Sequence, residues 1–172
     1  MNSTAYLRFV LLSIVLIALQ LWVLSPIALF RVATPFLYPL LLLALPIGAS
    51  RVMLTIAGFA IGMVIDVLGG TPGLHASALT VTAFSRNYLL AALTDKYTLE
   101  DALPTYKLLH GGAVILLALL LALHHVVLFA LVSLRLFSGW HLLLCMAASW
   151  AFSFVLSLIG LLFFGVESTP RK

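Results

Sequence analysis

Charged residues are scarce in this chain: they make up 8% of its 172 residues, whereas a soluble domain has roughly 25%. Hydrophobic residues make up 64%, against about 45–50% in soluble domains. A soluble fold of this size cannot hide so many apolar side chains, so most of them must face lipid or one another within a bilayer. The composition therefore predicts an integral membrane protein that crosses the bilayer several times.

Long polar segments and cysteines are almost absent as well. The longest stretch rich in polar residues, 94–107, is too short to hold a core of its own, so any chemistry must lie between helices. Cys145 is the only cysteine, which excludes an intrachain disulfide and a thiolate metal cluster. The nine lysines and arginines are scattered singly, which argues against nucleic acid as a partner.

Apolar runs divide the sequence into six predicted membrane-spanning helices, which form a single domain over residues 1–172. The expected spans are 7–24, 35–49, 52–68, 74–93, 108–134 and 141–164. The first run lacks a small-x-small cleavage site, so we expect a retained helix rather than a signal peptide. The second contains Pro35, Pro39 and Pro46, which predicts a kinked helix whose freed carbonyl groups bind to neighbouring helices. The predicted fold class is an all-α polytopic membrane protein.

The distribution of lysine and arginine predicts how these spans are oriented. If the N-terminus lies in the cytoplasm, the residues on the inner side are Arg8, Arg51, Arg86, Lys96, Lys107, Arg171 and Lys172. The outer side then holds only Arg31 and Arg135. Positive residues concentrate in the cytoplasmic loops of membrane proteins. Both termini are therefore expected in the cytoplasm.

A stripe of small residues and one acid marks the third expected span. Gly58, Gly62 and Asp66 recur every four residues, and each such step turns only about 40° around a helix, so the three share one face. Glycines on a membrane helix let another backbone come close. The stripe therefore predicts a surface for helix packing or for binding a partner.

Two ionisable groups lie inside the expected spans. Asp66 lies near the outer end of its span, where an unpaired carboxylate is costly. We expect it to bind groups at that same end: backbone amides, water, or the basic residues His75, Arg31 and Arg135. Arg86 lies too deep to pair with Asp66 and is expected to extend along its helix to the inner surface. An anion site or a partner site near that surface is the alternative for Arg86.

Histidine and serine patterns give no case for catalysis or for a metal or cofactor site. His110 and His124 share a face at a spacing used by haem-binding bundles, but no second helix carries a matching pair. The adjacent His124 and His125 point in different directions, which favours hydrogen bonding between helices over metal binding. Small hydroxylated residues recur along the sixth span: Ser149, Ser153 and Ser157. That spacing is typical of a helix contact surface, so the chain is not expected to be an enzyme.

The residues from Pro35 to Leu93 resemble a known family. The core GFAIGMVIDVLGGTPGLHASALT is similar to the G-x-x-x-G-x-x-x-D segment, turn, Pro-Gly and small polar helix of MreD, the membrane subunit of the bacterial rod-shape complex. The upstream TPFLYPLLLLALP resembles the second helix of MreD proteins from Bacteroidetes-like bacteria. The residues that take the positions of the family's recurrent ones are Gly58, Gly62, Asp66, Gly73 and Arg86.

This resemblance implies a non-enzymatic scaffold in the bacterial inner membrane. Members of the family bind the single-span protein MreC. They help to organise the MreB-type cytoskeleton with the elongation glycosyltransferase and transpeptidase, and so support peptidoglycan synthesis and cell shape. The family also resembles in fold the vitamin-binding subunits of energy-coupling-factor transporters, so such a subunit is the alternative. It needs an outward-open polar pocket, for which the short outer loops offer few groups, among them Trp140 and His141, and this favours the scaffold.

Overall fold

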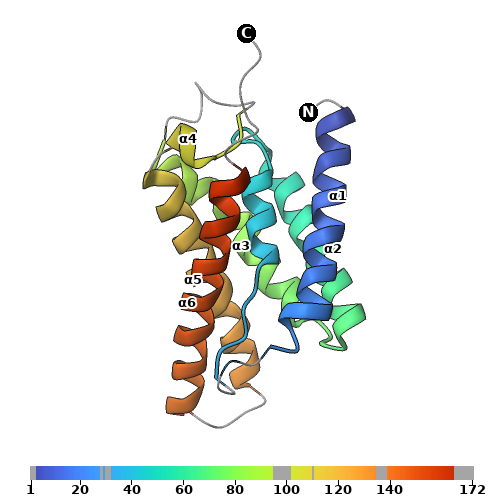
Figure 1. Ribbon diagram of the computed structural model, residues 1–172, viewed down its shortest axis with the longest axis vertical. Coiled ribbons are helices and arrows are strands. Elements are labelled where there is room, and N and C mark those ends of the chain that lie inside the picture. The colour runs from blue at the N-terminus through green and yellow to red at the C-terminus, as the bar shows by residue number, and fades with distance from the viewer. Residues whose placement is uncertain are drawn as a thin grey trace.

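A computed structural model shows a bundle of helices (Figure 1). The residues that it describes are 3–27, 29, 32–94, 102–109, 111–134 and 139–164. The helices in chain order are α1 (Ser3–Leu19), the π-helix η1 (Gln20–Leu24), the 3-10 helix η2 (Tyr38–Ala44), α2 (Arg51–Gly69), α3 (Leu74–Ala91), the short α4 (Tyr106–Leu109), α5 (Gly111–Ser133) and α6 (Gly139–Phe164). Within these ranges no β-strand is present.

Four stretches of helix are long and apolar enough to cross a membrane. They are Leu7–Leu24, Arg51–Gly69, Gly111–Ser133 and Gly139–Leu162. They correspond to the first, third, fifth and sixth expected spans. The predicted all-α fold with apolar spanning helices is thus confirmed, while the count of six spans stays a prediction.

The second expected span, 35–49, is not a continuous α-helix, and the expectation of a kinked helix is wrong there. Only Tyr38–Ala44 is helical, as η2. Pro39 lies in the first turn of η2, where the missing N–H does no harm. Leu45 is extended, with φ −99° and ψ 147°, because the ring of the following Pro46 excludes the helical conformation at the residue before it. The prolines therefore end the helix instead of bending it.

The residues 33–49, called here the central segment, lie in the interior of the bundle. η2 packs against α1, α3, α5 and α6, and Tyr38, Leu41 and Leu42 are wholly buried. Figure 1 shows the central segment between α1 and α6. A stretch of chain with little regular secondary structure thus occupies the middle of an apolar bundle.

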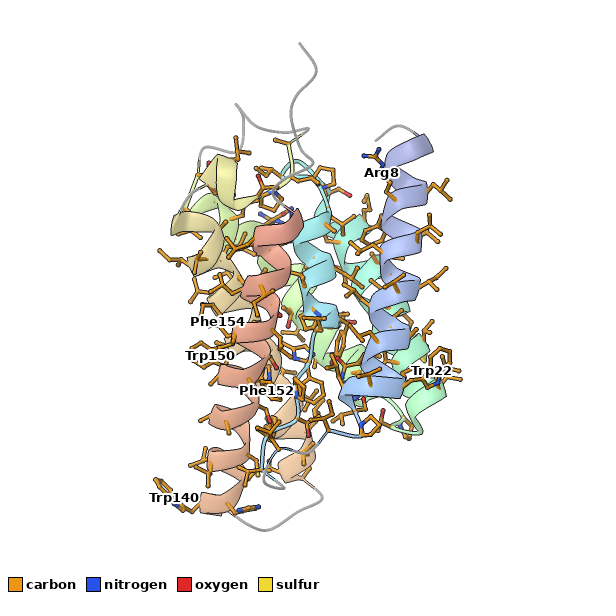
Figure 2. All side chains as sticks on the ribbon, in the orientation of Figure 1. Arg8, Trp22, Trp140, Trp150, Phe152 and Phe154 are labelled. Carbon is orange, nitrogen blue, oxygen red and sulfur yellow. The ribbon has the colours of Figure 1, made fainter. Side chains whose placement is uncertain are left out.

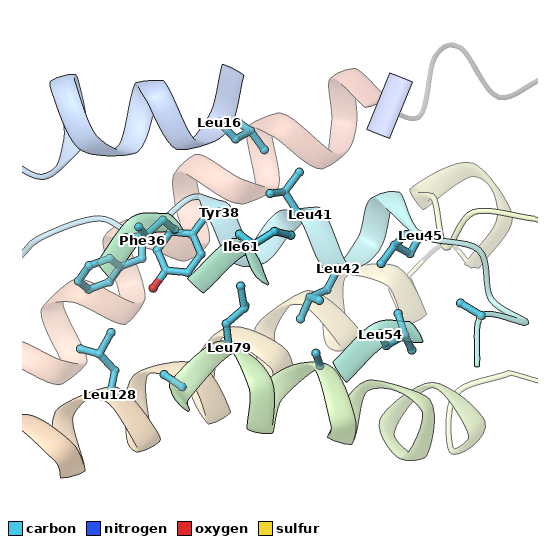
Figure 3. Packing of buried hydrophobic residues seen from close by; sticks show 14 residues of the cluster. Leu16, Phe36, Tyr38, Leu41, Leu42, Leu45, Leu54, Ile61, Leu79 and Leu128 are labelled. Atoms are coloured by element: carbon cyan, nitrogen blue, oxygen red, sulfur yellow. The ribbon is translucent and has the colours of Figure 1, made fainter. Parts of the chain in front are cut away.

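The leucines of η2 belong to two hydrophobic cores. Residues three apart share a face of a 3-10 helix, so Leu40 and Leu43 point together into a core formed with α3, α5 and α6. Leu41 and Leu42 pack instead into a core formed with α1, α2, α3 and α5 (Figure 3). The central segment therefore joins the two cores.

The glycine stripe lies where α2 meets α3. A methyl carbon placed on Gly62 would lie 2.5 Å from the Cα of Ala76 and 2.6 Å from the carbonyl oxygen of His75. On Gly58 it would lie 2.7 Å from the Cβ of Ala83. Both glycines therefore serve helix packing within the chain, and because α3 covers them, a partner would contact other residues.

We expect Gly62→Ala to lower stability more than Gly58→Ala. At Gly62 the new methyl group meets backbone atoms of α3, whereas at Gly58 its nearest neighbour is the Ala83 side chain. Overpacking of this kind costs about 1–3 kcal/mol. The measurement is thermal unfolding of the purified variants in one detergent.

A second substitution tests whether contact with the Ala83 side chain causes the loss of stability in Gly58→Ala. Ala83→Gly removes one of the two contacts under 3.0 Å that the new methyl group makes, the other being the Leu79 carbonyl oxygen at 2.9 Å. The double variant Gly58→Ala/Ala83→Gly should therefore lose less stability than the sum of the losses of the two single variants. Ala60→Leu, on an exposed position of α2, serves as the control and should leave stability unchanged. Wild-type stability of Gly62→Ala would contradict close packing at this surface.

Candidate functional site

The backbone of the central segment is hydrogen-bonded by side chains from three other elements. A non-helical chain cannot satisfy its own N–H and C=O groups, and neither lipid nor apolar side chains can do so. The side chains that do so here are Gln20 of η1, Arg86 and Asn87 of α3, and Ser149 and Ser153 of α6. The prediction that the proline-rich run needs neighbours for its freed backbone groups is thus confirmed.

Gln20 holds the start of the central segment. Its Oε1 accepts a hydrogen bond from the N–H of Leu37 at 2.9 Å, and its Nε2 donates to the carbonyl oxygen of Pro35 at 3.0 Å. The side chain is buried and belongs to the first residue of the π-helix, a form of helix that is frequent at functional sites. A glutamine amide offers one acceptor and a donor, as a peptide group does, so it pairs with extended backbone.

Two serines of α6 hold the next residues. Ser149 Oγ accepts from the N–H of Thr34 at 3.0 Å, and Ser153 Oγ accepts from the N–H of Phe36 at 2.8 Å. Four residues of an α-helix rise about 6 Å, and two residues of extended chain span about 6.6 Å, so the two repeats match. The predicted contact surface on α6 is confirmed. The contact is made by serine hydroxyl groups that accept hydrogen bonds from backbone amides, which the spacing alone did not indicate. The hydroxyl of Ser157, one turn further, is buried and has no hydrogen-bond partner among the described residues.

Arg86 holds the end of the central segment. Its two terminal nitrogens donate to the carbonyl oxygens of Leu45 at 2.6 Å and Pro46 at 3.2 Å, and the adjacent Asn87 donates to the carbonyl oxygen of Ala49 at 2.8 Å. The Arg86 side chain is 0% exposed, so the expectation that it extends to the inner surface is wrong. Because η2 ends before Pro46, these carbonyls have no donor within a helix, and the planar guanidinium serves two of them at once.

Asp66 binds the first turn of α3. Its Oδ1 accepts from the N–H of His75 at 3.0 Å and from the hydroxyl of Thr71 at 2.8 Å, and its Oδ2 accepts from the N–H of Ala76 at 2.8 Å. These amides have no partner within their own helix. Gly73, at the N-cap with φ +80°, has no side chain to offer. The carboxylate also faces the positive end of the α3 dipole.

This geometry agrees with the expectation for Asp66. The carboxylate binds groups at its own end of the helix, and Arg86 donates elsewhere. His75 takes part through its backbone amide, while its imidazole binds Tyr38. The other two candidate partners, Arg31 and Arg135, lie outside the described residues.

A histidine cluster surrounds Tyr38. The Tyr38 hydroxyl lies 2.7 Å from Nδ1 of His75 and 2.7 Å from Nε2 of His124. His125 binds the carbonyl oxygen of Leu121 through Nδ1 at 2.7 Å and Ser153 Oγ through Nε2 at 3.2 Å. Hydrogen bonding of His124 and His125 to other elements is thus confirmed. In the described part of the chain, no group of three or more histidine, cysteine or acidic side chains could hold a metal ion, and His110 lies outside that part.

Sequence reasoning did not single out Gln20, Tyr38 or Asn87. A signal was present for Gln20, since it is a lone amide inside an apolar run, and a buried polar residue in a membrane helix marks an interaction. Tyr38 carried a weaker signal, since tyrosine is common at membrane surfaces. Asn87 stood beside Arg86 in the most polar of the expected spans.

A cavity of ≈ 460 Å³ adjoins the histidine cluster. It lies between η1, the start of the central segment, the end of α2 and the start of α3, and His75 and Thr71 are part of its lining. Apart from the Ser157 hydroxyl, the buried polar side chains described above are already bonded to the fold. The cavity is therefore the part of this site with room for another molecule.

We expect serine-to-alanine substitutions in α6 to have unequal effects. Ser153→Ala leaves the Phe36 N–H without an acceptor, which should lower stability by about 1–3 kcal/mol. Ser157→Ala is the matched control, because its hydroxyl has no partner in the described part of the chain, and it should be neutral or stabilising. Thermal unfolding of both variants gives the comparison, and equal losses would contradict the role given to the Ser153 hydroxyl.

No family model, curated protein or solved structure matches the chain. The likeness to MreD therefore rests on the residues quoted above. What the chain does follows from its site and from that resemblance, and it is a proposal.

Proposed function

We propose that this chain is a non-enzymatic scaffold subunit of the bacterial cell-elongation complex, as its resemblance to MreD implies. One observation supports this above the others: the ionisable groups inside the bundle have hydrogen bonds that serve the fold. Asp66 holds the first turn of α3, and Arg86 holds the central segment. Such groups in membrane proteins otherwise mark ion or substrate pathways. An interior used in this way suits a protein that acts through its surface.

Six crossings with both termini in the cytoplasm fit the arrangement of the bundle. Figure 1 shows the start of α1 and the end of α6 at the same end, as an even number of crossings requires. The central segment and α3 would supply the second and fourth crossings. Arg8 lies at that end (Figure 2), and Arg51 begins α2 there. The positive-inside rule makes this end cytoplasmic.

The partner in this proposal is an MreC-like single-span protein. Its helix must use side chains that face lipid, because α3 covers the glycine stripe. Of the four apolar stretches, Leu7–Leu24 and Gly139–Leu162 are each 17% buried, against 33% for Arg51–Gly69 and 39% for Gly111–Ser133. α1 and α6 therefore leave the most surface for another membrane helix.

The predicted topology can be tested with alkaline phosphatase, which is active only outside the cytoplasm. A fusion after Lys172 should be inactive, and a fusion after Gly73, in the turn between α2 and α3, should be active. A third fusion after Ser25, between η1 and the central segment, should also be active. If the central segment does not cross the membrane, the fusions after Ser25 and Gly73 will give opposite results. Matched β-galactosidase fusions, active only in the cytoplasm, should give the opposite pattern.

The scaffold function can be tested in the native host. Affinity purification of the tagged chain, followed by mass spectrometry, should recover an MreC-like protein. Depletion should convert rods to spheres without causing a vitamin requirement. An exposed control substitution on α2, Ile56→Leu, should leave recovery and membrane abundance unchanged. Rod shape that persists under depletion would refute the scaffold.

A vitamin-binding transporter subunit is the second candidate function. The cavity of ≈ 460 Å³ favours it, because small-molecule sites measure about 300–1,000 Å³ and this one lies at the end proposed to face outward. Loss of vitamin uptake on depletion, with rod shape kept, would support this function over the scaffold.

A further inference from the structure

The cavity beside His75 has a lining that limits what it can bind. Hydroxyl groups come from Ser25, Thr34 and Thr71, and most of the remaining surface is apolar. No lysine, arginine, aspartate or glutamate is among the described residues that line it. The nearby Asp66 already accepts three hydrogen bonds. Among the described lining residues a charged ligand would therefore lose water without gaining a counter-charge, which favours an uncharged one.

The histidine cluster determines which nitrogen of His75 carries a proton. Nδ1 of His124 is buried and has no hydrogen-bond partner in the part of the chain that the structure describes, and a bare lone pair there is tolerated better than an orphaned N–H. The His124 proton is therefore assigned to Nε2, where it is donated to the Tyr38 oxygen. Tyr38 then donates its own proton to Nδ1 of His75. Neutral His75 must carry its proton on Nε2, the nitrogen that Tyr38 leaves free for a ligand.

The hydroxyl groups of the lining complement this donor. Thr71 gives its proton to Asp66, so its oxygen offers lone pairs to the cavity. Ser25 Oγ accepts from Nε2 of Gln20 at 3.3 Å, so its proton is free to be donated. A hydroxyl group both donates and accepts, and an ester carbonyl accepts. These are the polar groups that suit this lining.

The mouth of the cavity lies at a surface that faces lipid. Trp22 and Leu68, both part of the lining, are 80% and 66% exposed. Figure 2 shows Trp22 pointing away from the bundle, and tryptophan is typical of the boundary between lipid and water. A ligand with an apolar body therefore has access from the bilayer.

We propose that this cavity binds an uncharged amphiphile, with its hydroxyl or ester group at His75 and Thr71 and its acyl chain along Trp22, Ile65 and Leu68. The inference goes beyond the scaffold function and does not depend on it. The ligand class follows from the described lining residues, none of which is charged, from the donor on His75 and from the opening toward lipid. The polar end of the site is preformed, since Tyr38 and Asp66 hold His75 in place.

The test is direct binding to the full chain in nanodiscs. Tritiated monodecanoylglycerol is the probe, and empty nanodiscs measure its partition into lipid. Unlabelled monodecanoylglycerol should displace the probe, while decanoate, with the same chain and a negative charge, should need at least about tenfold more. Decane should displace it poorly. Binding equal to that of empty nanodiscs, or equal displacement by all three competitors, would overturn the proposal.

Variants locate the binding in this cavity. A methyl carbon on Gly69 would meet Leu21 at 3.5 Å and Thr71 at 3.7 Å, which are ordinary contacts, so Gly69→Leu should fold and fill the space. It should abolish specific binding. His75→Asn keeps an acceptor for Tyr38 and loses the Nε2 donor, so it should weaken binding about two- to tenfold, as expected for one hydrogen bond.

Two further variants, one in the lining and one control, test whether the probe binds in this cavity. Ser25→Ala tests the hydroxyl end of the lining if His75→Asn does not fold, and should weaken binding by a similar factor. Ile159→Leu, an exposed position on α6, should bind the probe as the wild type does. Thermal unfolding in the same nanodiscs establishes which variants are folded. Undiminished binding to folded Gly69→Leu would refute this cavity as the site.

Discussion

The hydrogen bonds of the central segment are what the rest of this structure depends on. Residues 33–49 cross the interior with only seven residues in η2, and an apolar interior gives unpaired amides and carbonyls no other partner. Three different helices supply side chains that hydrogen-bond to this backbone: Gln20, Arg86 and Ser153. The polar residues of an otherwise apolar chain are therefore concentrated where the backbone needs them. The two cores meet at η2, so the same segment that requires polar partners also links the apolar packing.

Close packing and charge placement act together at α2 and α3. Gly62 lets the first turn of α3 lie against α2, and Asp66, one turn later on the same face, then reaches the amides of His75 and Ala76. A side chain at Gly62 would move those amides away from the carboxylate as well as separating the helices. His75 in turn holds Tyr38, so the effect would reach the central segment. Gly58, Gly62 and Asp66 therefore act together: the glycines bring α3 close, and the carboxylate then binds its backbone amides.

The parts of this architecture that sequence predicts are those set by local composition. Apolar runs placed α1, α2, α5 and α6 correctly, because each run is long enough to define a helix by itself. The prolines predicted that 35–49 needs external partners, yet the choice between a kink and a break depends on the hydrogen-bond donors that Arg86 and Asn87 supply to its carbonyl groups. The sequence placed Arg86 at the inner surface, because its position along α3 cannot show that the end of the central segment folds over it. The sequence predicted the surroundings of Asp66 more accurately, because its partners follow it within ten residues along the chain. The cavity was not anticipated, because it is formed by four segments that only the fold brings together.

The match between Ser149, Ser153 and the extended residues Thr34 and Phe36 has a consequence for how such sequences can diverge. One residue inserted between the two serines would turn the second by about 100° around the helix, and its hydroxyl would lose the Phe36 amide. A deletion would do the same in the opposite sense. Relatives of this chain should therefore vary in length at their loops while keeping a fixed spacing in the middle of α6. Between the serines, Trp150 donates to the carbonyl oxygen of Ala118 at 3.3 Å, whereas Ala151 is exposed and free to exchange. The spacing of the hydroxyls is therefore a more durable mark of descent than overall identity.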